Sequence, residues 1–271
     1  MSDRRPAVAG MFYPGDARGL LRMVGDFLST SGRSPDASVT GLVCPHAGYV
    51  YSGRTAGAAF ASAPDQVRTV VIVAPCHRYP VRGASVYGGE AYLTPLGRMP
   101  VNREIADRLA AAGHRYEPRA HELEHAEEVQ VPFVQVRWPG ARIVPVVQGY
   151  SDGRSAAALA SDLRAALADE EDVLLVASSD LSHYHDIETA RLMDAGFQEA
   201  FESGDPARLE RVLSSGSSEA CGGGPVLTLL NWAALGGPFA AERIAYDTSA
   251  TASGDSSAVV GYFAGCTRRT G

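Results

Sequence analysis

Cysteine is scarce in this sequence and unpaired in its spacing. The chain has four cysteines in 271 residues, at positions 44, 76, 221 and 266, and no two of them form a CxxC pair. Secreted disulfide frameworks and zinc ribbons both need closely spaced cysteines, so neither class of protein is favoured. Each cysteine is therefore interpreted singly.

Long hydrophobic runs are also missing. No segment approaches eighteen consecutive apolar residues, and the first residues, MSDRRPAVAGMFYPGD, include two arginines but no apolar stretch of the kind found in signal peptides. We therefore expect a cytoplasmic protein with no membrane partner.

An excess of positive charge is absent as well. The formal net charge is -7, from 24 basic and 31 acidic side chains. Proteins that bind a phosphate backbone need a concentrated basic face. No nucleic-acid partner is expected.

Three apolar runs, Gly41–Cys44, Thr69–Ala74 and Val173–Ala177, show no polar alternation. Such runs are typical of parallel strands that are buried on both faces by helices. With 45% hydrophobic residues, no internal repeat and no long linker, the chain is expected to form one domain over residues 1–271. The predicted fold is an α/β three-layer sandwich, with a central mostly parallel or mixed β-sheet flanked by helices.

Further elements are expected from residue patterns along the chain. Helices are predicted at about 16–28, 101–112, 155–168, 187–203, 207–213 and 226–235, and a close-packed helix in the small-residue stretch 47–63. Additional strands are predicted at 84–87, 142–148 and 257–263, and a loop at 90–100.

Histidines follow all three apolar runs. His46 comes after Cys44 and Pro45, His77 comes soon after Pro75, and His183 lies in the segment SSDLSH after the third run. The carboxyl ends of parallel strands meet at one edge of a sheet, and neutral imidazole is a common metal ligand. A lone histidine is usually a surface or core residue, but three in the same topological position predict a metal site.

Cys221 is a fourth candidate ligand. It precedes a glycine-rich turn and Pro225, which suits the first turn of a helix. The exposed N–H groups and dipole of a helix N-terminus favour a thiolate, which binds metals or acts as a nucleophile. Cys44, Cys76 and Cys266 are expected to be small hydrophobic residues. Asp180 is expected to orient His183 or to bond its own backbone.

Two segments leave alternatives open. HELEHAEEVQVPF, at 121–133, is either a solvated acidic helix face or a partly buried segment that carries polar groups inward. Tyr49 and Tyr51 are either structural or face the substrate.

Five motifs are distinctive: PHAGYVYSG at 45–53, APCHRYP at 74–80, EHAEEVQVPF at 124–133, SSDLSHY at 178–184 and ACGGGP at 220–225. Together they give the chain a strong resemblance to the Memo family, whose bacterial and archaeal members are called AmmeMemoRadiSam system protein B. Their order and spacing match over nearly the whole chain. The resemblance implies the fold of the class III extradiol dioxygenases, which are non-haem Fe(II) enzymes.

The resemblance also implies roles for single residues. His46, His77 and Cys221 match the metal ligands, and His183 matches an acid/base histidine. Pocket positions are matched by Asp180, Glu124, His125 and Gln130. The family has cysteine where the dioxygenases have a carboxylate, and Gly223 stands where relatives often carry arginine.

These observations predict a metal-dependent oxidoreductase of dioxygenase type that acts on a small molecule. Fe(II) is the expected ion, and copper is the alternative because a thiolate ligand favours softer metals. The family name implies a radical SAM enzyme and other proteins of the same system as partners. One alternative is a signalling adaptor that binds peptides in the same pocket, as animal relatives are described to bind phosphotyrosine peptides. Another is a thiol hydrolase that uses Cys221 with His183.

Overall fold

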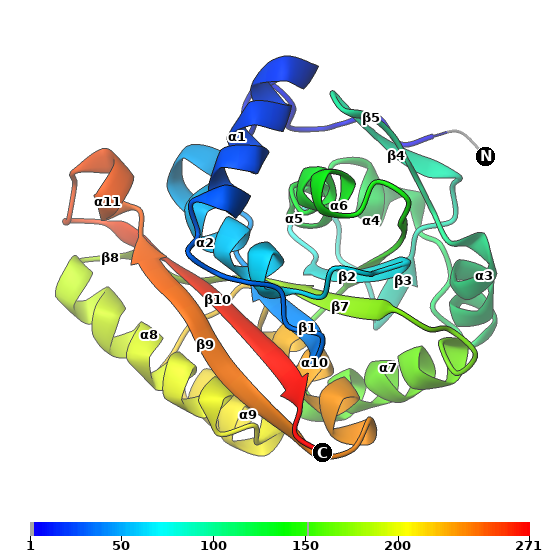
Figure 1. Ribbon diagram of the computed structural model, residues 1–271. Helices are drawn as coiled ribbons and strands as arrows, with labels where there is room; N and C mark the ends of the chain where they lie inside the picture. Colours follow the sequence, from blue (N-terminus) through cyan, green and yellow to red (C-terminus); the bar gives the residue numbers. More distant parts are fainter. Residues whose placement is uncertain (1–2, 151) are drawn as a thin grey trace.

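Four parallel strands form the centre of the main sheet, in the order β6 (Arg142–Gln148), β2 (Thr69–Pro75), β7 (Val173–Ser178) and β1 (Val39–Cys44). The computed structural model describes residues 3–150 and 152–271 (Figure 1). Apart from Arg142 and Val173, every residue of these four strands is buried. Burial on both faces explains why these strands read as continuous apolar runs.

Antiparallel strands extend this centre on both sides. β3 (Ala84–Val86) pairs with β6, and the long strand β10 (Val259–Arg269) pairs with β1. β10 also pairs with β8 (Asp180–His185) and, along its other edge, with β9 (Phe239–Thr248). The sheet is therefore mixed, in the order β3-β6-β2-β7-β1-β10-β8, with β9 beside β10.

Helices cover both faces of the sheet, and the predicted three-layer α/β fold is confirmed (Figure 1). One face carries α1 (Ala17–Ser29), α2 (Tyr49–Ser62), α5 (His125–Glu128) and α6 (Val131–Arg137). The other carries α7 (Gly153–Ala166), α8 (Ile187–Glu202), α9 (Pro206–Ser214) and α10 (Gly223–Leu235). The remaining helices are α3 (Arg103–Ala111), α4 (Pro118–Glu122) and α11 (Ala250–Ser253). No helix among the described residues is long and apolar enough to cross a membrane.

Residues 90–100 and Phe239–Thr248 are among the segments that differ from expectation. Residues 90–100 form a hairpin of β4 (Ala91–Thr94) and β5 (Gly97–Pro100) rather than a loop, with Gly97 at φ 109° after the turn. A glycine tolerates this left-handed conformation at no steric cost. β9 was not predicted at all, because its half-buried sequence FAAERIAYDT carries neither a continuous apolar run nor a clean alternation.

Helix α2 packs closely because it presents glycines to its neighbour. A Cβ atom at Gly53 or Gly57 would collide with Phe27 of α1. Further along α2, Phe60 stacks on Phe133 of α6 with ring centroids 5.0 Å apart. The small residues of this segment thus allow the close packing that the sequence predicts.

A buried ion pair fastens the N-terminal segment to the helices α4 and α5. Arg4 Nη1 lies 2.6 Å from Glu128 Oε2, and the two side chains are 4% and 0% exposed. The Glu128 carboxylate also accepts hydrogen bonds from the Tyr13 hydroxyl and from the backbone of Ala7 and Val8. Arg4 donates in addition to the Glu124 carbonyl oxygen, at 2.5 Å. The buried Arg4–Glu128 ion pair therefore anchors the segment that carries Glu124 to the N-terminal residues.

Candidate metal centre

Three side chains from distant parts of the chain converge beyond the carboxyl ends of β1 and β2. His46, His77 and Cys221 each offer a ligand atom, and these atoms all lie within 4.8 Å of one another. His46 Nε2 is 3.2 Å from Cys221 Sγ, and the two imidazole centroids are 5.1 Å apart. His46 follows β1, His77 follows β2, and Cys221 precedes α10. The crevice at the strand ends thus gathers the residues that the sequence singles out.

The Nδ1 atoms of His46 and His77 each contact a buried side chain. His77 Nδ1 lies 2.9 Å from Glu124 Oε1, and the other oxygen of this fully buried carboxylate accepts the His77 backbone N–H at 2.6 Å. His46 Nδ1 lies 2.9 Å from the hydroxyl of Ser178, the last residue of β7. Contacts of this kind fix ring orientation in metal-binding histidines and leave Nε2 available to an ion.

Burial sets the protonation of the group. Burial and the neighbouring His77 lower the pKa of His46 to about 3, so its imidazole is neutral. Burial and the nearby Asp180 carboxylate raise the pKa of the Cys221 thiol well above its ordinary value. The expectation that the start of α10 favours a thiolate is therefore wrong for the protein alone, because loss of solvation outweighs the helix terminus. The neutral imidazole of His46, the second imidazole of His77 and a buried thiol that needs a cation to ionise fit a transition-metal ion.

Asp180 contacts His46 rather than His183. Its Oδ1 accepts the His46 backbone N–H at 2.8 Å, and its Oδ2 lies 4.0 Å from His46 Nε2. The Asp180 backbone N–H points at Cys221 Sγ, 3.3 Å away, and its carbonyl oxygen accepts the Cys221 N–H. Burial raises the pKa of this carboxyl to about 6. Asp180 therefore links the histidine and the cysteine, and the predicted pairing with His183 is corrected.

His183 does not occupy the same topological position as the other two histidines. After Ser179 the chain continues in the direction of β7 into β8, which pairs antiparallel with β10, so His183 lies within a strand opposite Val260 rather than just beyond a strand end. Its side chain is half-buried, and its backbone N–H lies 3.4 Å from Glu219 Oε2. His183 thus stands beside the three converging side chains and outside their group.

The acidic segment at 121–133 carries its polar groups inward, which decides between the two readings of the sequence. His121, Glu124, Glu127 and Glu128 are each 0% exposed. His125, whose side chain is 13% exposed, lies with its ring centroid 4.8 Å from that of His77, and burial together with His46 lowers its pKa to about 4. Of these side chains, Glu124 and His125 lie against His77, whereas Glu128 pairs with Arg4 and His121 with Glu127.

The other two expected pocket residues are buried. Gln130 is 0% exposed, and its Nε2 donates to the Pro45 carbonyl and to Ser178 Oγ, both at 3.0 Å. Tyr49 is 3% exposed, and its hydroxyl donates to the Val129 carbonyl at 2.6 Å. Gln130 thus supports the wall behind His46, whereas Tyr49 occupies a core position.

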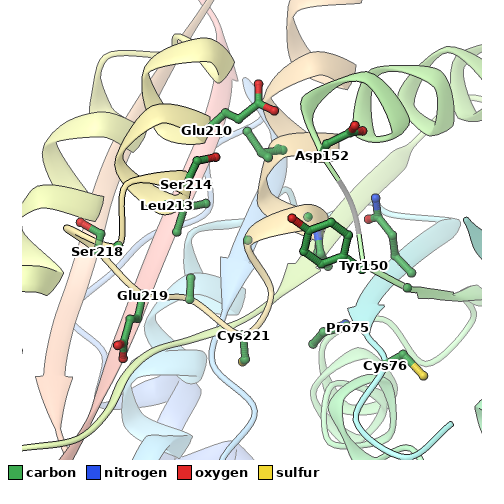
Figure 2. A pocket seen from close by; sticks show the side chains of 18 residues that line it. Pro75, Cys76, Tyr150, Asp152, Glu210, Leu213, Ser214, Ser218, Glu219 and Cys221 are labelled. Carbon is green, nitrogen blue, oxygen red and sulfur yellow. The ribbon is translucent and has the colours of Figure 1, made fainter. Parts of the chain in front are cut away.

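A cavity of about 570 Å³ opens beside Cys221, between the ends of β2 and β6 and the helices α9 and α10 (Figure 2). Cys76 and Tyr150 lie on one side of it, and Glu219 lies near Cys221 on the other. Three carboxylates, those of Asp152, Glu210 and Glu219, belong to its lining, and none of its described lining residues is arginine, lysine or histidine. Cys76 therefore lines a cavity, whereas Cys44 and Cys266 are buried as the sequence predicts.

Two residues of this region were missed by reasoning from sequence. Ser178 holds His46, and Glu219 contacts both His185, at 3.1 Å, and the backbone of His183. Ser178 ends a predicted strand, so the rule that selects strand-end histidines would also have selected this hydroxyl. Glu219 has no comparable signal, because its contacts depend on the pairing of β8 with β10.

Gly222 allows Cys221 to lie close to His46 and His77, and we expect Gly222→Ala to disturb this arrangement. An added Cβ would lie 2.6 Å from the Ser179 Cβ and 2.8 Å from its Cα, and would also strike the Ser178 carbonyl. Overpacking against backbone should cost about 1–3 kcal/mol of unfolding free energy, measured by urea denaturation. Gly223→Ala is the control, since its Cβ would meet the mobile end of Leu213. Equal stability of the two variants would contradict this reading.

Known proteins match this chain over nearly its whole length. The family model described as "Memo-like protein" matches residues 4–266. A "MEMO1 family protein" of Thermotoga maritima is 37% identical over 275 residues, covering 96% of this chain and 97% of that protein. Another, of Archaeoglobus fulgidus, is 35% identical and covers 96% and 97% of the two chains.

A solved structure gives the same answer for the fold. The crystal structure of an uncharacterised protein of Escherichia coli K12 matches with a TM-score of 0.54 at 15% identity, covering 84% of this chain and 99% of that one. Together with the family match, these likenesses account for the strand-end motifs and the order in which they occur. The chain belongs to the Memo-like protein family.

Proposed function

We propose that the protein is a metal-dependent oxidoreductase in which His46, His77 and Cys221 hold one metal ion. The observation that carries this proposal is the convergence of their ligand atoms within 4.8 Å, with the Nδ1 atoms of the two histidines held by Ser178 and Glu124. Fe(II) is the first candidate ion, and copper is the second because the sulfur ligand is soft. The similarity of its sequence motifs to those of a family related to extradiol dioxygenases supports chemistry with oxygen.

Each neighbouring residue has a role in this proposal. An ion held by His46, His77 and Cys221 would supply Lewis acidity toward oxygen or a substrate. Glu124 orients His77, and Asp180 positions the backbone of His46. His183, outside the ligand group, transfers a proton to or from the substrate. The cavity beside Cys221 receives a small molecule.

Two other functions fit the geometry less well. Phosphotyrosine peptides are recognised by clusters of arginine, and the described lining of the cavity carries three carboxylates without a basic residue. A thiol hydrolase needs a base beside its cysteine, but the imidazole next to Cys221 Sγ is His46, whose pKa of about 3 makes it a poor base.

Metal analysis of untagged protein purified without air tests the proposal. We expect about one iron or copper ion per chain, removable by chelation. Protein that carries no metal, and that binds phosphopeptides equally well before and after chelation, would contradict the oxidoreductase and favour the adaptor. Covalent labelling of Cys221 together with chelator-resistant hydrolysis would favour the hydrolase.

His183→Ala should keep the metal and lose activity. Its side chain lies outside the three-residue group, so removing it leaves the ligands intact. Loss of a proton-transfer group should reduce turnover by about 10²–10⁴-fold. Oxygen consumption with catechol as a model substrate, measured beside metal content, checks this. His185→Ala, which removes a half-buried neighbour bound to Glu219, is the control. Loss of metal from His183→Ala would make His183 a ligand and overturn the division of roles.

A further inference from the structure

The hydroxyl of Ser178 has three hydrogen-bonding neighbours and only one proton. Ser178 Oγ lies 2.7 Å from the Ala126 carbonyl oxygen, 3.0 Å from Gln130 Nε2 and 2.9 Å from His46 Nδ1. The residue is 0% exposed, so these contacts are made without bulk solvent. A serine hydroxyl donates one hydrogen bond and accepts at two lone pairs. All three places are taken, and their directions follow from the chemistry of the neighbours.

Two of these hydrogen bonds have a direction that is fixed by the partner, because each partner group can only accept or only donate. A carbonyl oxygen only accepts, so the Ser178 proton goes to Ala126. The Gln130 amide nitrogen lies 3.0 Å from the Pro45 carbonyl oxygen as well, which identifies it as the donating NH₂ end. Its second N–H therefore donates to Ser178. The remaining lone pair of Ser178 faces His46, and His46 Nδ1 must carry a hydrogen.

The opposite assignment is unfavourable. If Ser178 donated to His46, the Ser178 and Ala126 oxygens would face each other as two acceptors 2.7 Å apart in a buried place. An unsatisfied buried acceptor is costly to leave. In the Nδ1–H tautomer of imidazole, Nε2 has a free lone pair. That lone pair points to Cys221 Sγ, 3.2 Å away.

We propose that Ser178 is a positioning residue that fixes His46 in its Nδ1–H tautomer and so presents Nε2 to the ion that the proposed function places beside Cys221. Gln130 supports it by occupying one acceptor position of the hydroxyl. The two histidines are thereby prepared differently: His77 is held by a carboxylate, His46 by a neutral hydroxyl that cannot take its proton. The assignment of the tautomer rests on hydrogen-bond directions in the protein itself, and its use rests on the proposed function.

Nitrogen-15 NMR of the metal-free protein tests the tautomer directly. Long-range proton–nitrogen spectra should show His46 with a protonated Nδ1 and an unprotonated Nε2 in the wild type. In Ser178→Ala we expect a mixture of tautomers. The Ser62→Ala variant removes a buried hydroxyl that donates to Ala59 within α2, and it should leave the His46 signals unchanged. A wild-type His46 protonated at Nε2 would overturn the proposal, whether or not any variant folds.

Metal titration of the same proteins tests the consequence. Removing a residue that orients a ligand typically lowers metal affinity by about 10–100-fold, which is the loss expected for Ser178→Ala and not for Ser62→Ala. Wild-type affinity and an unchanged tautomer in Ser178→Ala would overturn the positioning role. A wild type that has the predicted tautomer but binds no metal would instead contradict the proposed function.

Discussion

Replacing His46 or His77 with alanine should abolish stoichiometric metal binding. Each supplies one of three converging ligand atoms, and loss of a ligand should exceed the effect of losing its supporting contact, so affinity should fall by more than about 100-fold. Both residues follow strand ends rather than lying within the strands, so the fold should survive. Metal content by elemental analysis, with circular dichroism to confirm folding, checks this result.

The sulfur ligand is tested in the same way with matched controls. Cys221→Ser should weaken binding, whereas Cys76→Ser should not, although Cys76 lines the cavity beside Cys221. His114→Ala controls for loss of an imidazole, since His114 pairs with Asp162 away from the group. Unchanged metal content in both His46→Ala and His77→Ala would refute the assignment. Equal losses at Cys76 and Cys221 would mean that the wrong sulfur has been chosen.

Removing one partner of the Arg4–Glu128 pair should cost about 3–5 kcal/mol of unfolding free energy. The two side chains are 4% and 0% exposed, and Arg4→Met leaves the Glu128 carboxylate without its counter-charge among buried groups. The Tyr13 hydroxyl and two backbone N–H groups would remain as its partners. Urea denaturation of Arg4→Met against the wild type measures the loss.

A surface pair provides the control for this prediction. Arg98 Nε lies 2.9 Å from Asp3 Oδ2, with side chains 51% and 29% exposed, and exposed pairs of this kind contribute about 0–1 kcal/mol. Arg98→Met should therefore have little effect. If Arg4→Met loses no more stability than Arg98→Met, the buried pair does not anchor the N-terminal segment.

The parts of the fold that could be predicted are those whose sequence reflects burial alone. Strands β1, β2 and β7 are continuous apolar runs, because helices cover both of their faces. Strand β8 could not be predicted, since DLSHYH gains its strand character from pairing with β10, about eighty residues later. The hairpin of β4 and β5 and the strand β9 likewise depend on partners rather than on their own patterns.

The candidate site likewise has features that follow from local sequence and features that depend on distant residues. The positions of His46 and His77 follow from strand ends, and the place of Cys221 follows from a helix start. The protonation state of Cys221 cannot be predicted from the helix start, because it depends on burial and on Asp180, which comes from another part of the chain. The pairing of Asp180 with the His46 backbone also joins residues far apart in sequence, so proximity to His183 in the chain was misleading.

The pairing of β10 with both β1 and β8 along one edge bears on when these side chains come together during synthesis. Residues 46 and 221 are separated by 175 positions, and β10, which pairs with both β1 and β8, follows both residues in the chain. Until Val259–Arg269 emerges, β8 has no partner along β10 and the edge of β1 that faces it stays open. Contacts of such long range are slow to form. A growing chain therefore displays His46 and His77 well before Cys221 is made, and the three side chains come together in their final setting only after Val259–Arg269 has been synthesised.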